Sequence, residues 1–138
     1  MSRQSDSRAR MVASAALLLR EQGLTGTSFG DVLEHSGAPR GSIYHHFPGG
    51  KDQLVEEAVR MAGDFVKGVL ERAAEGDDPV RALRSFLDAW RQVLRGGDFR
   101  AGCPVLAVAI EAPEETTTLA DAADEVFGAW AEVLAGVL

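Results

Sequence analysis

Residues 27–47 read Thr27-Ser-Phe-Gly-Asp-Val-Leu-Glu-His-Ser-Gly-Ala-Pro-Arg-Gly-Ser-Ile-Tyr-His-His-Phe47, and this stretch decides the fold of the chain. It has the pattern of two short helices joined by a tight glycine turn. Ser28 or Thr27 suits the N-cap of the first helix, because a hydroxyl can accept a backbone N–H that the helix leaves unpaired. Gly37 suits the end of that helix, where glycine adopts a left-handed backbone at little cost. The stretch therefore predicts a helix-turn-helix.

The second of these helices is expected to have one apolar and one polar side. At about 100° per residue, Ile43 and Phe47 share one face. Pro39 suits its first turn, since the missing N–H would be unpaired there anyway. The first helix points three apolar residues at the same core: Phe29, Val32 and Leu33. The polar side, with Arg40 at its border, carries Gly41, Tyr44 and His45. A helix of this kind can lay its polar side in the major groove of DNA.

Several segments match the pattern of a known family. They are Arg10-Met-Val-Ala-Ser-Ala-Ala-Leu-Leu-Leu19, Gly23, Thr27-Ser28-Phe29, Val32, Gly37, Arg40-Gly41-Ser42, Ile43-Tyr44-His45-His46-Phe47 and Lys51-Asp52 with Leu54. On these residues, the segment 8–51 resembles the DNA-binding domain of the TetR (tetracycline-repressor) family of bacterial transcriptional regulators. Two segments, 44–54 with its Pro-Gly-Gly loop and 102–111, are similar to the lincomycin-resistance-regulator-like (LmrA/YxaF-like) branch. The resemblance covers most of the chain and is most specific in its N-terminal part.

The resemblance implies a set of DNA contacts to phosphates and base edges. It carries them onto Thr27, Ser28, Pro39, Arg40, Gly41, Ser42, Tyr44, His45, His46 and Lys51. Pro39 departs from the Ser or Thr that is common in the family, so it supplies no hydroxyl. Arg40 stands where Lys is common; it keeps the charge and adds a fork that can bind guanine or phosphate in two places. Taken singly, Arg40, Tyr44 and Lys51 are ordinary surface residues, and their joint spacing is what favours DNA contact.

The formal net charge of −7 does not argue against DNA binding, because the acidic excess lies elsewhere. Residues 1–51 contain six Lys or Arg and four Asp or Glu, which gives +2. Residues 52–138 contain eight Lys or Arg and seventeen Asp or Glu, which gives a formal charge of −9. A helix that reads bases needs only a few local cations. The global charge predicts weak non-specific affinity for DNA.

The rest of the chain has helical periodicity, so we expect an all-α protein. Residues 1–51 should form a three-helix DNA-binding domain of the helix-turn-helix type, and residues 52–138 a helical domain for effector binding and dimerisation. Helices are expected at about 7–22, 51–75, 79–94, 104–111 and 119–138. Their inward faces are expected to include Val12, Ala16, Leu19, Leu54, Ala58, Met61, Phe65, Val69, Val80, Leu83, Phe86, Leu87 and Trp90. The chain ends at Leu138 without a cap, and the family normally has two further dimerisation helices, so this domain is expected to be incomplete.

The second domain is the place where a small effector is expected to bind. Apolar side chains that can line a pocket there are Met61, Phe65, Phe86, Trp90, Val105, Val108, Phe127 and Trp130. The same residues can equally form the hydrophobic core, and for any single one that is the stronger interpretation. An effector that moves the helix at 51–75 would change the spacing of two DNA-binding heads in a dimer.

Other classes of function have little support in the sequence. His45 and His46 are adjacent and point about 100° apart, which does not suit a shared metal ion. Cys103 is the single cysteine and lacks a catalytic signature, so we expect neither a disulfide nor a nucleophile. No cofactor and no enzymatic activity are expected. Neither a membrane span nor a secretion leader is evident, which favours a cytoplasmic protein.

These observations favour a ligand-responsive repressor that acts as a homodimer. Its partners would be double-stranded operator DNA and a small apolar or aromatic molecule that releases it. The alternative is a helical protein-interaction module without sequence-specific DNA binding. Repression rather than activation follows from the resemblance.

Overall fold

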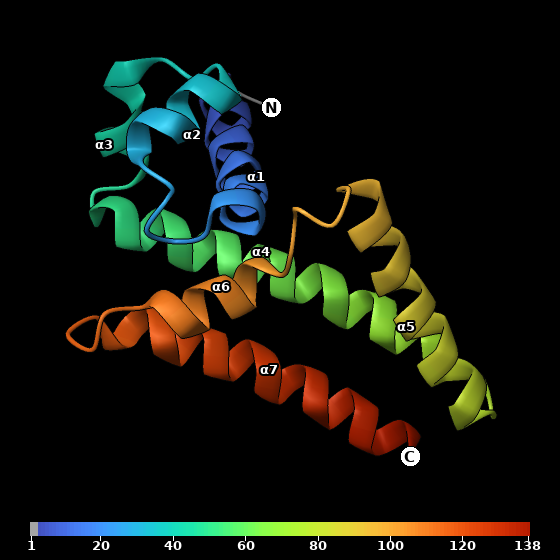
Figure 1. The fold of residues 1–138 in the computed structure, drawn as a ribbon. Helices are drawn as coiled ribbons and strands as arrows, with labels where there is room; N and C mark the ends of the chain where they lie inside the picture. Colours follow the sequence, from blue (N-terminus) through green and yellow to red (C-terminus); the bar gives the residue numbers. More distant parts are fainter. Residues whose placement is uncertain (1–2) are drawn as a thin grey trace.

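The computed structural model describes residues 3–138, and within that range it contains helices and no strands (Figure 1). The elements are α1 (Arg3–Gln22), α2 (Phe29–Ser36), the 3-10 turn η1 (Arg40–Ser42), α3 (Ile43–His46), α4 (Gly50–Ala73), α5 (Pro79–Gly96), α6 (Pro104–Glu111) and α7 (Thr117–Val137). The expected all-α fold is therefore confirmed. None of the described helices combines the length and the apolarity needed to cross a membrane.

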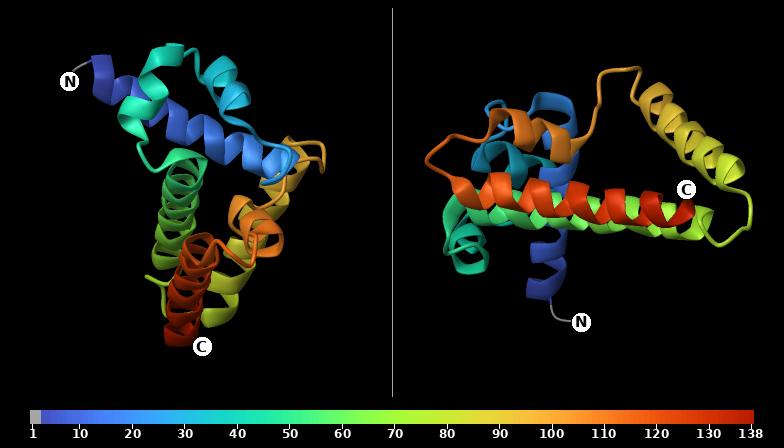
Figure 2. Two further views of the ribbon diagram at one scale, coloured as in Figure 1. Left: turned by 90° about the vertical axis from the view of Figure 1, so that its left-hand side faces the viewer. Right: turned by 90° about the horizontal axis from the view of Figure 1, so that it is seen from below.

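The long helix α4 connects two groups of helices. Figure 1 shows α1, α2 and α3 gathered around the start of α4, and we call this group the head. The remainder of α4 packs with α5, α6 and α7, and we call this group the body. Both views in Figure 2 show α7 alongside α4, while α5 folds back from the far end of α4. Helix α4 thus begins in the head and continues without a break into the body.

Local sequence explains where these helices begin and end. Gly23 follows α1 with a φ of 75°, a left-handed backbone that glycine adopts readily. Asp78 caps α5 by accepting hydrogen bonds from the backbone N–H groups of Val80 and Arg81. Pro79 opens that helix, where it sacrifices no hydrogen bond. The sequence prediction for this break is confirmed.

The hydrophobic core runs from the head into the body as one cluster. Its largest fully buried side chains are Phe47, Met11, Leu19, Leu54, Leu119, Val32, Val59, Val105 and Val108. The expected burial of Val12, Ala16 and Leu19 on α1, and of Leu54 and Ala58 on α4, is confirmed.

Several side chains that were expected to point inward are exposed. On α4, Met61 is 41% and Phe65 69% exposed. On α5 the exposed large apolar residues are Val80, Leu83, Leu87 and Val93, and Ala82 is that helix's one buried residue. The expectation was wrong because α5 makes most of its contacts with α4 and lies beside α7 only near its start, at Pro79, Ala82 and Leu83. A helix with a strong apolar stripe and so few neighbours leaves part of that stripe uncovered.

A small residue allows α4 and α7 to approach closely. Gly63 is buried on α4, and its backbone carbonyl accepts a hydrogen bond of 2.9 Å from the indole N–H of Trp130 on α7. A Cβ placed on Gly63 would meet both methyl groups of Val126 at 2.7 Å. These contacts fix α7 against α4 at a point where no side chain fits between them.

We therefore expect Gly63→Ala to destabilise the protein by about 1–3 kcal/mol, the usual cost of overpacking a core. The matched control is Gly68→Ala on the same helix, where the nearest atom to a new Cβ is the flexible end of Arg72 at 3.4 Å. That control should be neutral or stabilising by up to about 1 kcal/mol, since alanine favours a helix over glycine. Urea unfolding followed by circular dichroism measures both. Equal midpoints for the two variants would contradict the close approach of the helices.

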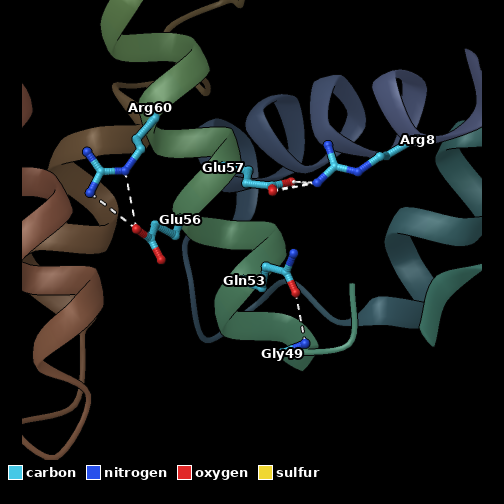
Figure 3. Close-up of polar contacts among 6 residues, drawn as sticks. All are labelled: Arg8, Gly49, Gln53, Glu56, Glu57 and Arg60. Atoms are coloured by element: carbon cyan, nitrogen blue, oxygen red, sulfur yellow. Dashed lines mark hydrogen bonds and ion pairs between the residues drawn. The ribbon is translucent and has the colours of Figure 1, made fainter. Parts of the chain in front are cut away.

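Polar contacts tie the head to α4. Figure 3 shows Arg8 of α1 reaching Glu57 of α4, with Nη2 at 2.5 and 2.7 Å from the two carboxylate oxygens. The same guanidinium lies 5.0 Å from the centre of the Phe47 ring. Figure 3 also shows Gln53, which accepts a hydrogen bond from the backbone N–H of Gly49 at the start of α4. Arg8 therefore links α1, α3 and α4 at one point.

A second set of contacts ties α6 to the loop between α1 and α2. The Glu111 carboxylate accepts hydrogen bonds from the backbone N–H of Thr25 at 2.7 Å and from the Thr25 hydroxyl. These bonds hold the pKa of Glu111 below its usual value, because they favour the charged carboxylate. The last residue of α6 thus contacts the head directly.

Candidate DNA-binding surface and ligand pocket

The helix-turn-helix forms as the sequence predicts. Ser28 is the N-cap of α2, and its hydroxyl accepts a hydrogen bond of 3.1 Å from the backbone N–H of Asp31. The Asp31 carboxylate accepts in return from the Ser28 backbone N–H at 2.8 Å. Gly37 ends α2 with a φ of 66°. These two ends set the angle at which the chain enters α3.

The turn after Gly37 differs from the prediction in one respect. Pro39 lies before the helical residues, with an extended backbone, and does not belong to the first helical turn. Helical structure starts as a 3-10 turn at Arg40 and becomes α-helical only at Ile43. Gly41 explains the loose start, because glycine disfavours the helix interior.

The apolar side of α3 fastens it to the head. Ile43 is 2% exposed, and Phe47 at the end of α3 is fully buried. They pack in the same core as Val32 of α2 and Met11 of α1. The opposite side of α3 is consequently held outward.

Four residues form what we call the polar ridge: Arg40, Gly41, Tyr44 and His45. All four are exposed, and the Tyr44 side chain is 72% accessible. The Tyr44 ring lies edge-on to Phe29 of α2, with centroids 6.1 Å apart, which holds its phenol in place on the surface. A Cβ on Gly41 would meet nothing within 4 Å, so this position leaves room for another surface to approach. The ridge presents one cation, one phenol and one imidazole on a single short segment.

Three of the other expected contact residues use their hydroxyls in hydrogen bonds within the protein: Thr27, Ser42 and Ser28. Thr27 is 2% exposed and donates its hydroxyl to the Gly23 carbonyl at 2.7 Å. Burial removes it from the candidate surface. The Ser42 hydroxyl donates to the Pro39 carbonyl at 2.6 Å. Ser28 is exposed, but its hydroxyl donates to the Asp31 carboxylate at 2.8 Å and is engaged in the cap.

Two expected cationic contacts also lie differently from the sequence prediction. The Lys51 ammonium donates to the Leu24 carbonyl at 3.0 Å, so it joins α4 to the loop between α1 and α2. His46 is half-buried, and its Nε2 atom is buried with no hydrogen-bond partner among the described residues. Its ring packs against Phe47, with centroids 6.3 Å apart. The sequence could not show this because His45 and His46 are adjacent and only the packing of α3 decides which one turns inward.

The surroundings of His46 predict a pH-dependent stability. Burial lowers the pKa of His46 below its usual value, and the nearby charges of His45 and Arg8 lower it further. A histidine whose pKa in the folded state is depressed takes up protons more readily when unfolded. Stability is therefore full above the unfolded pKa of about 6.5 and decreases as the pH falls below it.

We expect the urea midpoint of the protein to decrease between pH 7.5 and pH 5.5, and His46→Gln to reduce this decrease. Asp31 and Glu111 do not contribute in this pH range. Their carboxyl pKa values are lowered, so these groups take up protons only under more acidic conditions. The control His35→Gln changes the histidine that contacts Ser14 and should keep the wild-type slope. A midpoint in His46→Gln that decreases as steeply as in the wild type would contradict this assignment.

A pocket of about 430 Å³ lies between α1, α4 and α5. It is lined by Ala13, Ala16, Leu17, Arg20, Met61, Ala62, Phe65, Val66, Val69, Phe86, Ala89, Trp90, Val93, Gly102 and Pro104. Met61, Phe65, Phe86 and Trp90 were expected to line a ligand site, and the structure brings these four together. The exposure of Met61 and Phe65, unexpected for a core, follows from this position, while Phe86 and Trp90 are half-buried.

The other four expected lining residues do not reach this pocket. Val105 and Val108 of α6 are 1% and 0% exposed and belong to the core. Phe127 and Trp130 lie on α7, where their rings contact each other at 5.4 Å on the other side of α4. For these residues the core interpretation holds.

The sequence prediction missed the wall that α1 contributes. Ala13, Ala16, Leu17 and Arg20 recur at helical spacing on a second face of α1. Leu17 is 43% exposed, which is unusual for a residue next to a buried stripe. A second stripe of small and apolar residues on the first helix was the available signal. The pocket is therefore shared between the head and the body.

The described residues contain no group of three or more His, Cys, Asp or Glu side chains placed to hold a metal ion. Cys103 is a half-buried free thiol just before α6. Neither observation adds a second candidate site.

A head that presents an outward polar ridge on a helix-turn-helix, joined to a helical body, defines the class of helix-turn-helix DNA-binding regulators. Comparison with known proteins gives the family. Residues 12–58 match the family described as bacterial regulatory proteins, tetR family, and residues 79–138 match the LmrA/YxaF-like transcriptional regulator C-terminal domain. The chain belongs to the TetR family of transcriptional regulators.

Curated relatives agree with this membership. The uncharacterized HTH-type transcriptional regulator Rv0196 of Mycobacterium tuberculosis is 48% identical, over 93% of this chain and 67% of its own length. The HTH-type transcriptional regulator LmrA of Bacillus subtilis is 33% identical, over 93% and 69%. These names are those of regulators and not of enzymes. The chain thus spans about two thirds of each relative.

Solved structures share the fold. A TetR transcriptional regulator from Chloroflexus aurantiacus superposes with a TM-score of 0.80 at 30% identity, covering 99% of this chain and 69% of that one. A TetR-family regulator from Agrobacterium tumefaciens gives a TM-score of 0.86 at 21% identity, covering 97% and 70%. The latter likeness shows the fold alone.

Proposed function

We propose that this protein is a repressor that binds operator DNA as a homodimer and releases it when a small apolar or aromatic molecule binds. Residues 1–51 form the DNA-binding domain in this proposal, and residues 52–138 carry the functions of effector binding and dimerisation. In this proposal the protein acts in the cytoplasm, where its double-stranded DNA partner is found. The exposed polar ridge on a firmly packed α3 is the observation that carries the proposal.

Each ridge residue has a chemical task in the major groove. The Arg40 guanidinium can donate two hydrogen bonds to one guanine or one phosphate. Gly41 lets the backbone approach the groove without a side chain in the way. Tyr44 and His45 can donate to phosphates, which positions the head without specifying sequence. Ser42 and Pro39 would lie at the edge of the same contact.

Lys51 and His46 have supporting tasks in this proposal. Lys51 of α4 donates to the Leu24 carbonyl and so ties α4 to the head, and His46 packs against the buried Phe47 ring at the end of α3. They contribute to DNA binding by positioning the ridge.

The position of the pocket supports release by an effector. Because its wall includes α1 and α4, a bound molecule contacts the head and the helix that carries it. TetR-family regulators act as dimers, and two heads must reach successive major grooves about 34 Å apart. A ligand that prefers one relative position of α1 and α4 shifts this spacing, and operator affinity changes with it.

Fluorescence anisotropy on a labelled duplex from the region upstream of the protein's own gene tests the proposal. We expect tight binding to this duplex, weaker binding to a scrambled duplex, and a decrease in affinity of about tenfold with a saturating apolar probe, in line with typical coupling between sites. Naphthalene, decan-1-ol and decanoate form the probe set. Equal affinity for both duplexes would support the protein-interaction alternative, and unchanged affinity with every probe would rule out release through this pocket.

A further inference from the structure

The pocket between α1, α4 and α5 has one residue that does not fit an apolar ligand. Among the described residues that line it, Arg20 is the only charged one; the others are apolar or glycine. Arg20 also lines a neighbouring hollow beside Glu21 and Gln92. It therefore stands at the rim, where the apolar pocket meets a more polar surface.

Arg20 is held at this rim by two reciprocal hydrogen bonds. Its side-chain Nε donates to the Gly102 carbonyl at 3.1 Å, and the Gly102 backbone N–H donates to the Arg20 carbonyl at 2.8 Å. Gly102 itself lines the pocket, just before α6. The Nε hydrogen bond thus orients the side chain before any ligand arrives, which reduces the entropy lost on binding.

The charge of Arg20 is not neutralised within the described part of the chain. Arg8, Arg10, Arg60 and Arg91 each lie within 4.0 Å of a carboxylate, whereas no ion pair forms at Arg20. Nε is occupied by Gly102, but the two terminal nitrogens have no hydrogen-bond partner among residues 3–138. An arginine with two free donors matches the two oxygens of a carboxylate.

We propose that the effector is an amphipathic organic monoanion, with its apolar part in the pocket and its carboxylate or sulfonate against Arg20. This inference rests on the effector pocket of the proposed function and specifies its ligand class. An uncharged molecule fills the apolar volume but leaves the guanidinium unpaired, and a cation is repelled by it. Because Arg20 belongs to α1 and its partner Gly102 to the segment before α6, the anion binds where the head meets the body.

A series of probes with one tail and three head groups tests the charge preference. We use decanoate, decan-1-ol and decyltrimethylammonium, and follow the fluorescence of Trp90, which lines the pocket, in the full protein. Decanoate is expected to bind at least about tenfold more tightly than decan-1-ol, consistent with hydrogen bonds to a charged group, and the cation most weakly. Equal affinities of decanoate and decan-1-ol, or no binding by any probe, would overturn the proposal.

Substitutions test whether Arg20 causes the preference for decanoate over decan-1-ol. Arg20→Met should abolish the difference between decanoate and decan-1-ol, while Arg20→Lys should retain part of it because it keeps the charge. Arg10→Met removes a charge from α1 away from the pocket and should behave as the wild type. A preference that survives in Arg20→Met would overturn the role of Arg20. Trp90→Phe should remove the signal change, which shows that the probes bind at this pocket and not elsewhere.

Operator binding separates the two proposals. If decan-1-ol releases the operator as well as decanoate does, the monoanion inference fails and the repressor proposal stands. If decanoate binds with the expected preference but leaves operator affinity unchanged, the ligand class stands and release through this pocket fails.

Discussion

Phe47→Ala is expected to destabilise the head by about 3–5 kcal/mol, the usual cost of removing a buried phenylalanine side chain. Phe47 is fully buried, sits in the core cluster with Ile43, and carries the Arg8 guanidinium over its ring. Its removal leaves a cavity under α3 and takes away the surface on which Arg8 rests. The loss should appear as a decrease in the urea midpoint and as loss of operator binding at temperatures where the wild type binds.

The matched control is Tyr44→Ala on the same short helix. Tyr44 is 72% exposed, so its removal should change the free energy of unfolding by no more than about 0.5 kcal/mol. Phe47→Leu should give an intermediate loss because it keeps much of the volume. Similar losses for Phe47→Ala and Tyr44→Ala would show that α3 does not have one buried and one exposed side.

Arg40→Ala is expected to lower operator affinity by about 10- to 100-fold for each head, without changing the urea midpoint. A side chain that binds a base in two places contributes about 1–3 kcal/mol of discrimination, and each 1.4 kcal/mol corresponds to about tenfold in affinity. Arg40 is exposed, with no ion pair among the described residues, so its removal leaves the fold intact.

The control for charge alone is Arg84→Ala, which removes an exposed arginine from α5 in the body. It should reduce operator affinity far less. Arg40→Lys keeps the charge but not the fork, so it should retain non-specific binding and lose preference for the operator. An affinity that drops equally in Arg40→Ala and Arg84→Ala would indicate binding by overall charge, with no reading by the ridge.

The local pattern was sufficient to predict the two helices of the helix-turn-helix and the core that they share. Ile43 and Phe47 are four residues apart, and Gly37 marks the turn before them, so their shared burial followed from helical spacing. From the sequence, the N-cap of α2 could be assigned only to either Thr27 or Ser28. The structure distinguishes them because the Thr27 hydroxyl bonds back to Gly23, four residues earlier, while Ser28 remains at the helix start.

The pocket could be predicted only in part, for a physical reason. The spacing of Phe65, Phe86 and Trp90 shows that each lies on an apolar face, but not which neighbour covers that face. The approach of α1 to the body, which brings Leu17 and Arg20 to the pocket, depends on contacts between residues far apart in sequence, such as Arg20 with Gly102. Periodicity within one helix carries no information about such pairs.

The central claim is that the polar ridge reads the major groove, and methylation protection tests it most directly. Dimethyl sulfate attacks guanine N7 in the major groove and adenine N3 in the minor groove. On the upstream duplex, the full protein should protect guanine N7 positions in two clusters about one helical turn apart, and Arg40→Ala should lose that protection. Protection confined to adenine N3, or guanine protection that Arg40→Ala leaves intact, would contradict the account.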